Sequence, residues 1–490
     1  MAEIKTENLS IFKKFFKDTL IYGVAAVLPK AINVLLVKLH TSSLTPSEYS
    51  VNTSFYVWAA YFNVVLTYGM ETAFFRFFNS EKEKGKVVST AFISVFTTSI
   101  FALCTLLFFK DRFSDLLGFS NPLYFSLLVW ISILDTLIII PFAYLRVTGK
   151  SKKYTLFRVL NIFVYAVFNI FFLWFLPKST YGFPEVIQNL YDPSYKEGSI
   201  FIANLIASAV TFMCVLPLIF KFKISFNSSI FKKMIRYSWP ILVAGLAYTT
   251  NENLDKLILE DWLGKSTMGA YAGAYKIGVI MSLYIMAFRL GAEPFFFNHA
   301  SNKNAPITYA IILKWFVIIG ALFVVSIVGY VDFVASIFLG NKAYYQALSI
   351  VPLILIANLF LGIYNNLSIW YKLTDKTTYG MYISIFGALI TIALLYLLIP
   401  IIGFIGAAWA TVAAYGSMLL ISYFLGRKHY PVPYDVKRIG SYLFICILFS
   451  ALSFLKFQGN LWISNLFIAL FVIIVYLQEK KELMQILKRS

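Results

Sequence analysis

The stretch that decides the fold is Gly69–Phe75 (GMETAFF), because it returns near the middle of the chain as Gly291–Phe297 (GAEPFFF). Two further pairs of segments repeat in the same order and at nearly the same offset: Ser43–Tyr56 with Trp262–Tyr275, and Arg146–Lys150 with Lys372–Lys376. Three matches in register predict an ancient duplication. In an all-membrane chain, two repeated halves are expected to enclose a transport pathway at their interface.

The composition places these repeats in a membrane. Sixty per cent of the 490 residues are hydrophobic and 13% are charged, more apolar surface than a soluble chain of this length could bury. Apolar stretches of about 20 residues, the length that spans a bilayer, recur about fourteen times. We predict spans near 18–39, 50–75, 87–109, 122–144, 155–176, 199–220, 238–262, 268–297, 306–330, 348–371, 377–398, 403–425, 439–456 and 460–478.

The predicted fold is therefore an all-α, polytopic membrane protein of about 14 transmembrane helices. Two parallel six-helix lobes carry the repeat, and two extra C-terminal helices follow, because an even number of spans per repeat gives both repeats the same orientation. The predicted parts are an N-terminal lobe (1–220), a linker (221–237), a C-terminal lobe (238–425), the two additional helices (439–478) and a tail (479–490).

The distribution of Lys and Arg predicts the orientation. With fourteen spans both termini lie on one side, and most of the 42 Lys and Arg then fall on that side, which the positive-inside rule makes cytoplasmic. The net charge of +19 is then explained by topology and by contact with anionic membrane lipids. No nucleic-acid partner is expected, because the basic residues sit in short loops between spans.

Several classes of function are excluded by what the sequence lacks. There is no glycine-rich phosphate loop ending in Lys-Ser/Thr, so no ATPase is encoded. His40, His299 and His429 are isolated, so no metal site and no cofactor are predicted. A membrane glycosyltransferase, polymerase or ligase would need a sizeable external loop with catalytic side chains, and the longest, Lys178–Gly198, is too short to fold as one. We predict that the protein is not an enzyme.

Charges inside spans are the first candidates for function, because they are costly to place in a bilayer. Lys30 follows Pro29 in the middle of the first span, and Asp135 lies deep in the fourth. One interpretation gives Lys30 a place in a substrate cavity. The other makes it the partner of Asp135 in a structural ion pair.

A second group of charges lies in the seventh and eighth spans: Glu252, Asp255, Lys256, Lys276, Arg289 and Glu293. Glu252 and Lys256 are four residues apart, as are Arg289 and Glu293, so each could be a pair within one helix. Asp255 and Lys276 are expected at similar depths on successive helices. That pair could be structural, or it could open and close during transport.

A third group lies near the cytoplasmic ends of the predicted helices. Long side chains that reach the interface explain Arg76, Arg146, Arg158 and Arg289 singly. Together they could ring the inner mouth of a cavity and attract phosphate, which Arg binds through its planar fork. Glu71 and Glu293 occupy matching positions in the repeats. One interpretation is that they only cap their helices or pair with these arginines; the other is that with Arg146 they form an inner gate.

Several ordered motifs resemble one known family. The series Trp239-Pro240, Asp255, Leu263-Gly264, Gly269-Ala270-Tyr271, Tyr275-Lys276, Phe288 and Glu293-Pro294 resembles the seventh and eighth helices of bacterial polysaccharide (Wzx-like) flippases. These belong to the multidrug/oligosaccharidyl-lipid/polysaccharide (MOP) exporter superfamily. The segment Leu44–Tyr49 looks like that family's first external loop, with Ser50 where Gly is commoner, and Asp135, Pro141 and Leu145-Arg146 look like its fourth helix.

The resemblance implies a flippase in the bacterial cytoplasmic membrane that moves undecaprenyl-diphosphate-linked oligosaccharide to the outer leaflet by alternating access. It implies that Lys30, Lys276, Arg289 and Arg76 meet the pyrophosphate. Asp135, Glu252, Asp255 and Lys256 become candidates for coupling to a Na⁺ or H⁺ gradient or for gating pairs. Expected partners are the lipid-linked substrate, membrane lipids, and a polysaccharide polymerase with glycosyltransferases, and we expect a monomer. The alternatives are a lipid II flippase or a multidrug/cation antiporter of the same superfamily; the deep lysines favour an anionic substrate.

Overall fold

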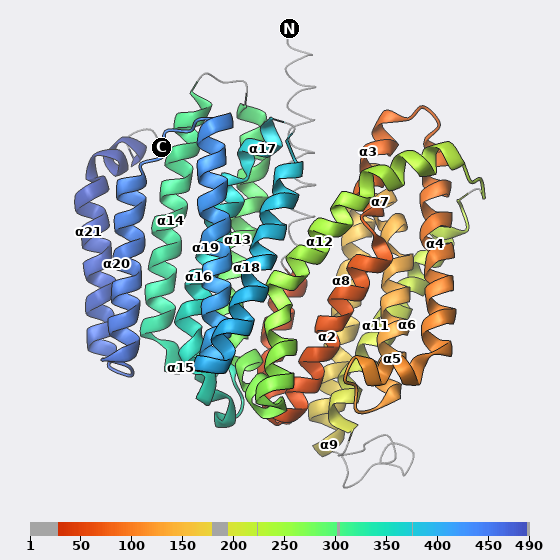
Figure 1. Cartoon of the computed structure of the whole chain (residues 1–490), viewed down its shortest axis with the longest axis horizontal. Coiled ribbons are helices and arrows are strands. Elements are labelled where there is room, and N and C mark those ends of the chain that lie inside the picture. Colours follow the sequence, from red (N-terminus) through yellow and green to blue (C-terminus); the bar gives the residue numbers. More distant parts are fainter. Residues whose placement is uncertain (1–27, 179–194, 223, 301–303, 375, 488–490) are drawn as a thin grey trace. The chain divides into compact units, whose positions relative to one another are not determined.

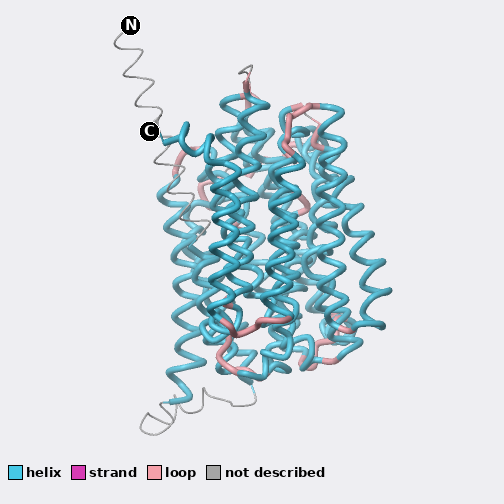
Figure 2. Tube along the Cα trace, turned by 90° about the vertical axis from the view of Figure 1, so that its left-hand side faces the viewer, coloured by secondary structure: helices cyan, strands magenta, loops and turns pink. Residues whose placement is uncertain are grey.

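The structure is a computed structural model that describes residues 28–178, 195–222, 224–300, 304–374 and 376–487. The start of the predicted first span (18–27), most of the longest external loop (179–194) and the end of the tail (488–490) lie outside this part. Helices joined by short loops account for the described chain, which contains no strand (Figure 2). The all-α prediction is confirmed.

The chain forms two compact units, Met1–Leu257 and Ile258–Ser490, whose boundary falls inside one long helix, α12. Residues 28–43 are helical in the first unit. The elements that follow there are α2 (Pro46–Thr67), α3 (Met70–Ser80), α4 (Lys84–Phe108), α5 (Lys110–Leu116), α6 (Pro122–Leu137), α7 (Ile139–Val147), α8 (Ser151–Ile170), the π-helical turn η1 (Phe171–Phe175), α9 (Leu176–Lys178), α11 (Lys196–Ile219) and α12 (Ser228–Leu263) (Figure 1).

The second unit continues from the end of α12. Its elements are α13 (Lys265–His299), α14 (Ala305–Gly329), α15 (Val331–Phe338), the 3₁₀ segment η3 (Lys342–Ile350), α16 (Val351–Leu367), α17 (Ile369–Leu373), α18 (Thr378–Ile402), α19 (Phe404–His429), α20 (Val436–Leu455) and α21 (Leu461–Leu487). Helix α21 runs on through residues 479–487, which were expected to form the tail, so the boundary predicted at residue 479 lies inside a helix.

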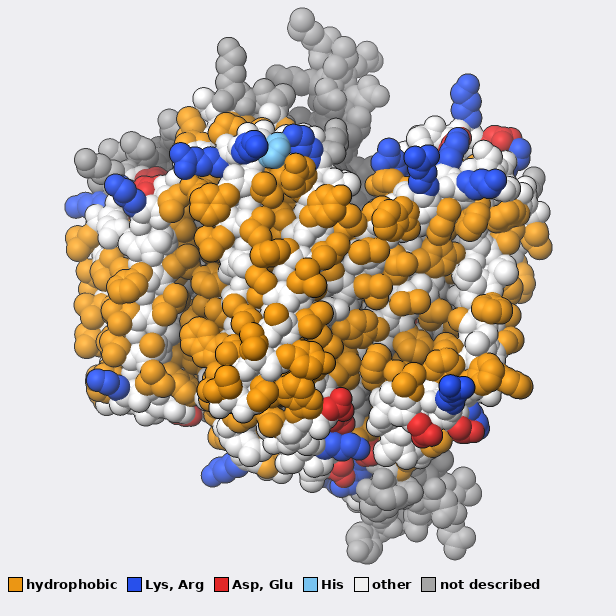
Figure 3. All heavy atoms as spheres, viewed as in Figure 1, with side chains coloured by type: hydrophobic (Ala, Val, Ile, Leu, Met, Phe, Trp, Pro, Cys, Tyr) orange, Lys and Arg blue, Asp and Glu red, His pale blue; other side chains and the backbone are white. Residues whose placement is uncertain are grey.

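Eleven helices in the described residues are long and apolar enough to cross a membrane, and each coincides with a predicted span. The other three predicted spans are 18–39, only part of which is described, 50–75 and 238–262. The last two correspond to α2–α3, which breaks at Tyr68–Gly69, and to α12, which carries Glu252, Asp255 and Lys256. In both units hydrophobic side chains cover the middle of the helices, and Lys and Arg gather at the ends (Figure 3).

Matching helix breaks in the two units support the predicted duplication. Helix α2 begins at Pro46 and α13 at Lys265, at the offset predicted from the sequence repeat. In the first unit α4 is followed by short α5, and α6 gives way to short α7; in the second, α14 and α15 and then α16 and α17 repeat this pattern. Pro141 explains the α6–α7 break, because it cannot donate a hydrogen bond to the carbonyl of Leu137, where α6 ends.

The repeated glycine differs between the units. Gly69 has φ +72°, and a β-carbon built there would lie 2.8 Å from the carbonyl oxygen of Ser238 on α12. Only glycine permits both this left-handed conformation and the close approach. Gly291 lies inside the unbroken helix α13 with nothing within 4 Å of such a carbon. The first copy of the repeated segment therefore begins at a helix break that packs against α12, whereas the second copy lies within a continuous helix.

Candidate functional site

Four helices of the first unit bring a set of polar side chains into its interior. The Tyr56 hydroxyl of α2 lies 3.2 Å from the Tyr165 hydroxyl of α8, and Asn204 of α11 donates to Tyr56 over 3.3 Å. Nearby, Asn161 of α8 donates to Thr211 of α11 over 3.0 Å. Polar side chains are expensive in a bilayer and mark functional pathways by default.

Asp135 of α6 is the carboxylate of this polar interior. Its carboxyl group lies beside the Ser208 hydroxyl of α11, outside the geometry of a direct hydrogen bond, and within electrostatic reach of the Arg158 guanidinium and the Tyr56 hydroxyl. Arg158 itself packs over the ring of Phe142, 5.1 Å from its centroid. The sequence identified Asp135 and Arg158 separately, and the structure brings them into one neighbourhood.

Several buried oxygens on the helices that carry this site lack hydrogen-bond partners. In the described part of the chain ten buried side-chain N or O atoms have none, and eight of them belong to the first unit. Asn52 Oδ1 of α2 and Ser132 Oγ of α6 are among the eight. A buried acceptor without a partner costs about 1–3 kcal/mol, and such an atom can accept a hydrogen bond from a ligand or bind a cation.

At its C-terminal end, α8 gives way after Ile170 to the π-helical turn η1. Pro177 cannot donate to the carbonyl of Leu173, and the Ser43 hydroxyl donates to that carbonyl instead, over 3.3 Å. Asn169 is buried, and its Oδ1 accepts a hydrogen bond from His40 Nε2 at 2.8 Å. His40, which looked isolated in the sequence, is therefore part of the polar interior, because its partner lies 129 residues away.

The predicted inner-gate residues form the same ion pair in each repeat. Arg146 of α7 bonds Glu71 of α3 at 3.2 Å in the first unit. In the second unit Lys372 of α17, which aligns with Arg146 in the repeat, pairs with Glu293 of α13. Arg289 adds a longer contact to Glu293 at 3.4 Å. In each unit, one repeated segment therefore contacts another: Gly69–Phe75 contacts Arg146–Lys150, and Gly291–Phe297 contacts Lys372–Lys376. The sequence showed only that these segments repeat.

The charged side chains of α12 make contacts within their own helix. Lys256 Nζ donates to the Asp255 carboxylate over 2.8 Å and to the backbone carbonyl of Glu252 over 2.6 Å, and both Asp255 and Lys256 are buried. Lys256 therefore bonds the Glu252 main chain, and a pair with the Glu252 carboxylate stays a prediction. A pair of Asp255 with Lys276 would join residues of the two units and stays a prediction.

The four predicted pyrophosphate ligands have different surroundings. Lys30, Arg76 and Arg289 are exposed, and Lys276 on α13 is half-buried. Arg76 lies over the ring of Tyr237, 4.4 Å from its centroid, and Arg289 contacts Glu293. Their role as substrate ligands stays a prediction. Within the described residues no group of three His, Cys, Asp or Glu could hold a metal ion.

One charged cluster was missed by the sequence analysis. Glu479 of α21 is fully buried and accepts from Lys314 of α14 at 2.7 Å, from Arg438 of α20 at 3.0 Å and from Tyr442 of α20 at 2.8 Å. Lys314 also pairs with Glu482. These contacts tie the two C-terminal helices to α14, beside which they lie in Figure 1. The only sign of this cluster in the sequence is Lys314, a single lysine within an apolar stretch.

Comparison with known proteins places the chain in a family. The model of the polysaccharide biosynthesis protein family matches residues 15–298, more than half of the chain, and the MatE model matches residues 240–397. A search of curated proteins gives no match.

Solved structures of the MOP superfamily share the fold. A lipid II flippase MurJ in an inward closed conformation has TM-score 0.72 and 15% identity, covering 94% of this chain and 99% of that one. An inward-facing multidrug resistance MATE transporter has TM-score 0.64 and 14% identity over 86% and 95%. A MOP superfamily transporter from Pyrococcus furiosus has TM-score 0.61 and 15% identity over 87% and 96%. The chain belongs to the polysaccharide biosynthesis protein family and has the fold of the MOP-superfamily transporters.

Proposed function

We propose that this protein is a flippase that moves undecaprenyl-diphosphate-linked oligosaccharide units from the cytoplasmic to the outer leaflet of a bacterial cytoplasmic membrane. The observation that carries the proposal is the family match over residues 15–298 in a chain built of membrane-spanning helices. A polysaccharide pathway needs its lipid-linked intermediates carried across the bilayer, and alternating access is the mechanism this class of fold uses.

The cations of the predicted pathway support an anionic substrate. Lys30, Arg76 and Arg289 are exposed, and Arg side chains bind phosphate oxygens in a bidentate manner. In this proposal they and Lys276 receive the diphosphate of the substrate, while Glu71, Arg146 and Glu293 belong to the inner gate. Loss of these cations is expected to weaken transport of an anionic lipid and to leave insertion unchanged.

We assign coupling to Asp135 among the acidic candidates. Asp255 is already paired with Lys256 at 2.8 Å, so proton or Na⁺ binding there would have to break an ion pair. Asp135 lies instead beside the Ser208 hydroxyl, on a set of helices whose buried oxygens include several without partners, and such oxygens are the ligands that a cation or a proton-bearing water would use. Na⁺ and H⁺ are separated by testing transport with each gradient alone.

A lipid II flippase is the alternative function. The observation that favours it is the likeness to MurJ, whose TM-score is 0.72 over 94% of this chain. Both substrates carry a diphosphate on a polyprenyl lipid, so the same cations would serve either.

Deletion of the gene in its own host tests the proposal. We expect lipid-linked oligosaccharide to accumulate on the cytoplasmic leaflet and surface polysaccharide to be lost, with both restored by the wild-type gene. Accumulation of lipid II with normal surface polysaccharide would instead support the alternative.

A further inference from the structure

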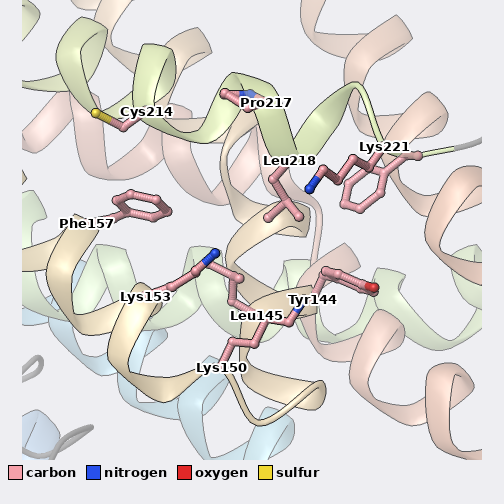
Figure 4. A pocket seen from close by; sticks show the side chains of 10 residues that line it. Tyr144, Leu145, Lys150, Lys153, Phe157, Cys214, Pro217, Leu218 and Lys221 are labelled. Carbon is pink, nitrogen blue, oxygen red and sulfur yellow. The ribbon is translucent and has the colours of Figure 1, made fainter.

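A cavity of about 200 Å³ opens in the first unit where α7, α8 and α11 end or begin. Lys150 and Lys153 reach it from the start of α8, and Lys221 reaches it from the segment after α11. In Figure 4 the side chains of Lys153 and Lys221 extend toward each other across this space. Three lysine side chains, from two segments about seventy residues apart in the sequence, thus line one cavity.

No carboxylate of the described residues pairs with these lysines. None of the ion pairs in the described part of the chain includes Lys150, Lys153 or Lys221, and the one aromatic contact is that of Lys150 with the ring of Tyr144 at 5.8 Å. By contrast, the adjacent Arg146 pairs with Glu71. Helix α8 also begins at Ser151 without a side-chain cap, so its positive end adds to the field.

Apart from Tyr144, the rest of the lining is apolar: Leu145, Phe157, Cys214, Pro217, Leu218 and Phe222. The same two helices also carry exposed apolar side chains, namely Leu156 and Phe163 on α8 and Met213 on α11, with Phe220 directly after α11. A cationic rim joined to an apolar helix surface fits a molecule with a phosphate at one end and hydrocarbon at the other.

The alternative explanation is that the lysines only mark a membrane boundary. Lysines that snorkel from helix ends need no common target, and they commonly point away from one another into the interface. Convergence on one cavity, without a carboxylate among the described neighbours, is not required by topology. A free phosphate would be held by the same charges but would make no use of the apolar wall.

We propose that this cavity binds the phosphate headgroup of an anionic membrane phospholipid, with its acyl chains along α8 and α11. Lys150, Lys153 and Lys221 bind the phosphate oxygens. The site is a resident lipid site within the first unit and does not depend on which substrate the protein moves.

Cys214 provides a direct probe, because it lines the cavity and is exposed. In a Cys104→Ser/Cys446→Ala variant, the rate of labelling of Cys214 by N-ethylmaleimide is measured in detergent with added phosphatidylglycerol or phosphatidylcholine. At about ten times its Kd, phosphatidylglycerol should slow labelling by about tenfold. Phosphatidylcholine should not slow it.

Two controls separate the site from general effects. The triple variant Lys150→Gln/Lys153→Gln/Lys221→Gln should abolish the protection of Cys214. The matched triple variant Lys152→Gln/Lys232→Gln/Lys428→Gln removes equal charge from exposed lysines that do not line the cavity, and it should keep the protection. If the first triple variant is unstable, Lys153→Gln alone should weaken protection. A Cys214→Ser/Cys446→Ala variant, labelled at exposed Cys104 on α4, should show no protection.

The proposal is overturned if phosphatidylglycerol does not protect Cys214, if both triple variants lose protection equally, or if Cys104 is protected to the same degree. Equal protection by glycerol 3-phosphate at matched concentration would show a soluble-anion site and would overturn the lipid assignment.

Discussion

The two units differ in how far their buried polar groups are paired: of the ten unpartnered buried side-chain atoms in the described residues, eight lie in the first unit and two in the second. Glu479 is fully buried and contacts Lys314, Arg438 and Tyr442 across three helices. Asp135 lies in the first unit beside Ser208 and within electrostatic reach of Arg158, and the helices of that unit also carry the unpartnered Asn52 Oδ1 and Ser132 Oγ. A satisfied charge cluster fixes a fold, whereas an unsatisfied one can take a ligand. We therefore expect the Glu479 cluster to anchor the C-terminal helices, and the surroundings of Asp135 to serve the coupling role proposed for it.

The largest expected effect comes from breaking the paired cluster. Glu479→Gln removes the buried carboxylate that Lys314 and Arg438 share and leaves Lys314 with Glu482 alone, and we expect a loss of about 3 kcal/mol in stability, read as a lower unfolding temperature. The double variant Lys314→Leu/Glu479→Leu should recover part of this loss, because it removes both members of the most deeply buried ion pair. A double variant no better than the sum of both single variants would contradict the account.

Asp135→Asn tests the coupling role proposed for Asp135 in the first unit. We expect transport to fall by at least about tenfold, because the coupling group can no longer change charge, while stability stays within about 1 kcal/mol of wild type. The matched control is Asp115→Asn, an exposed Asp of the same unit on α5, which should transport normally. A fully active Asp135→Asn variant would remove Asp135 from the coupling role.

The repeated glycines provide the next test. Gly69→Ala places a β-carbon against the Ser238 carbonyl in a left-handed backbone, and we expect a loss of about 1–2 kcal/mol. Gly291→Ala meets nothing within 4 Å in a helix and should be neutral or stabilise by about 0.5–1 kcal/mol. Thermal unfolding of both variants measures the difference. Equal losses would mean that the two copies play the same packing role.

The smallest effect is expected at the repeated ion pair. Glu71 and Arg146 are both partly exposed, so Glu71→Lys or Arg146→Glu should change stability by less than about 1 kcal/mol. If the pair belongs to an inner gate, each reversal should nevertheless slow transport, and the double reversal should restore it. Transport that is unchanged in both single variants would leave the pair without a gating role.

Local sequence patterns were sufficient to predict the helices but not the contacts between distant ones. Span length predicted eleven of the membrane helices, and the offset between repeats predicted where α2 and α13 begin. Asp135 could be found because a carboxylate in an apolar stretch is costly. The buried cluster around Glu479 could not be predicted. Glu479 lies at the apparent end of the last apolar stretch, and its partner Lys314 lies 165 residues away in the sequence. His40 looked isolated for the same reason, because Asn169 is remote in sequence.

The central claim is transport of a lipid-linked oligosaccharide, and proteoliposomes test it most directly. The purified protein would be reconstituted with fluorescent undecaprenyl-diphosphate oligosaccharide, with lipid II or with a cationic dye. Movement to the opposite leaflet would be followed by accessibility to a membrane-impermeant quencher. The account predicts protein-dependent flipping of the oligosaccharide lipid that is lost in Asp135→Asn and stays intact in Asp115→Asn. Transport of the dye or of lipid II, with no flipping of the oligosaccharide lipid, would contradict it.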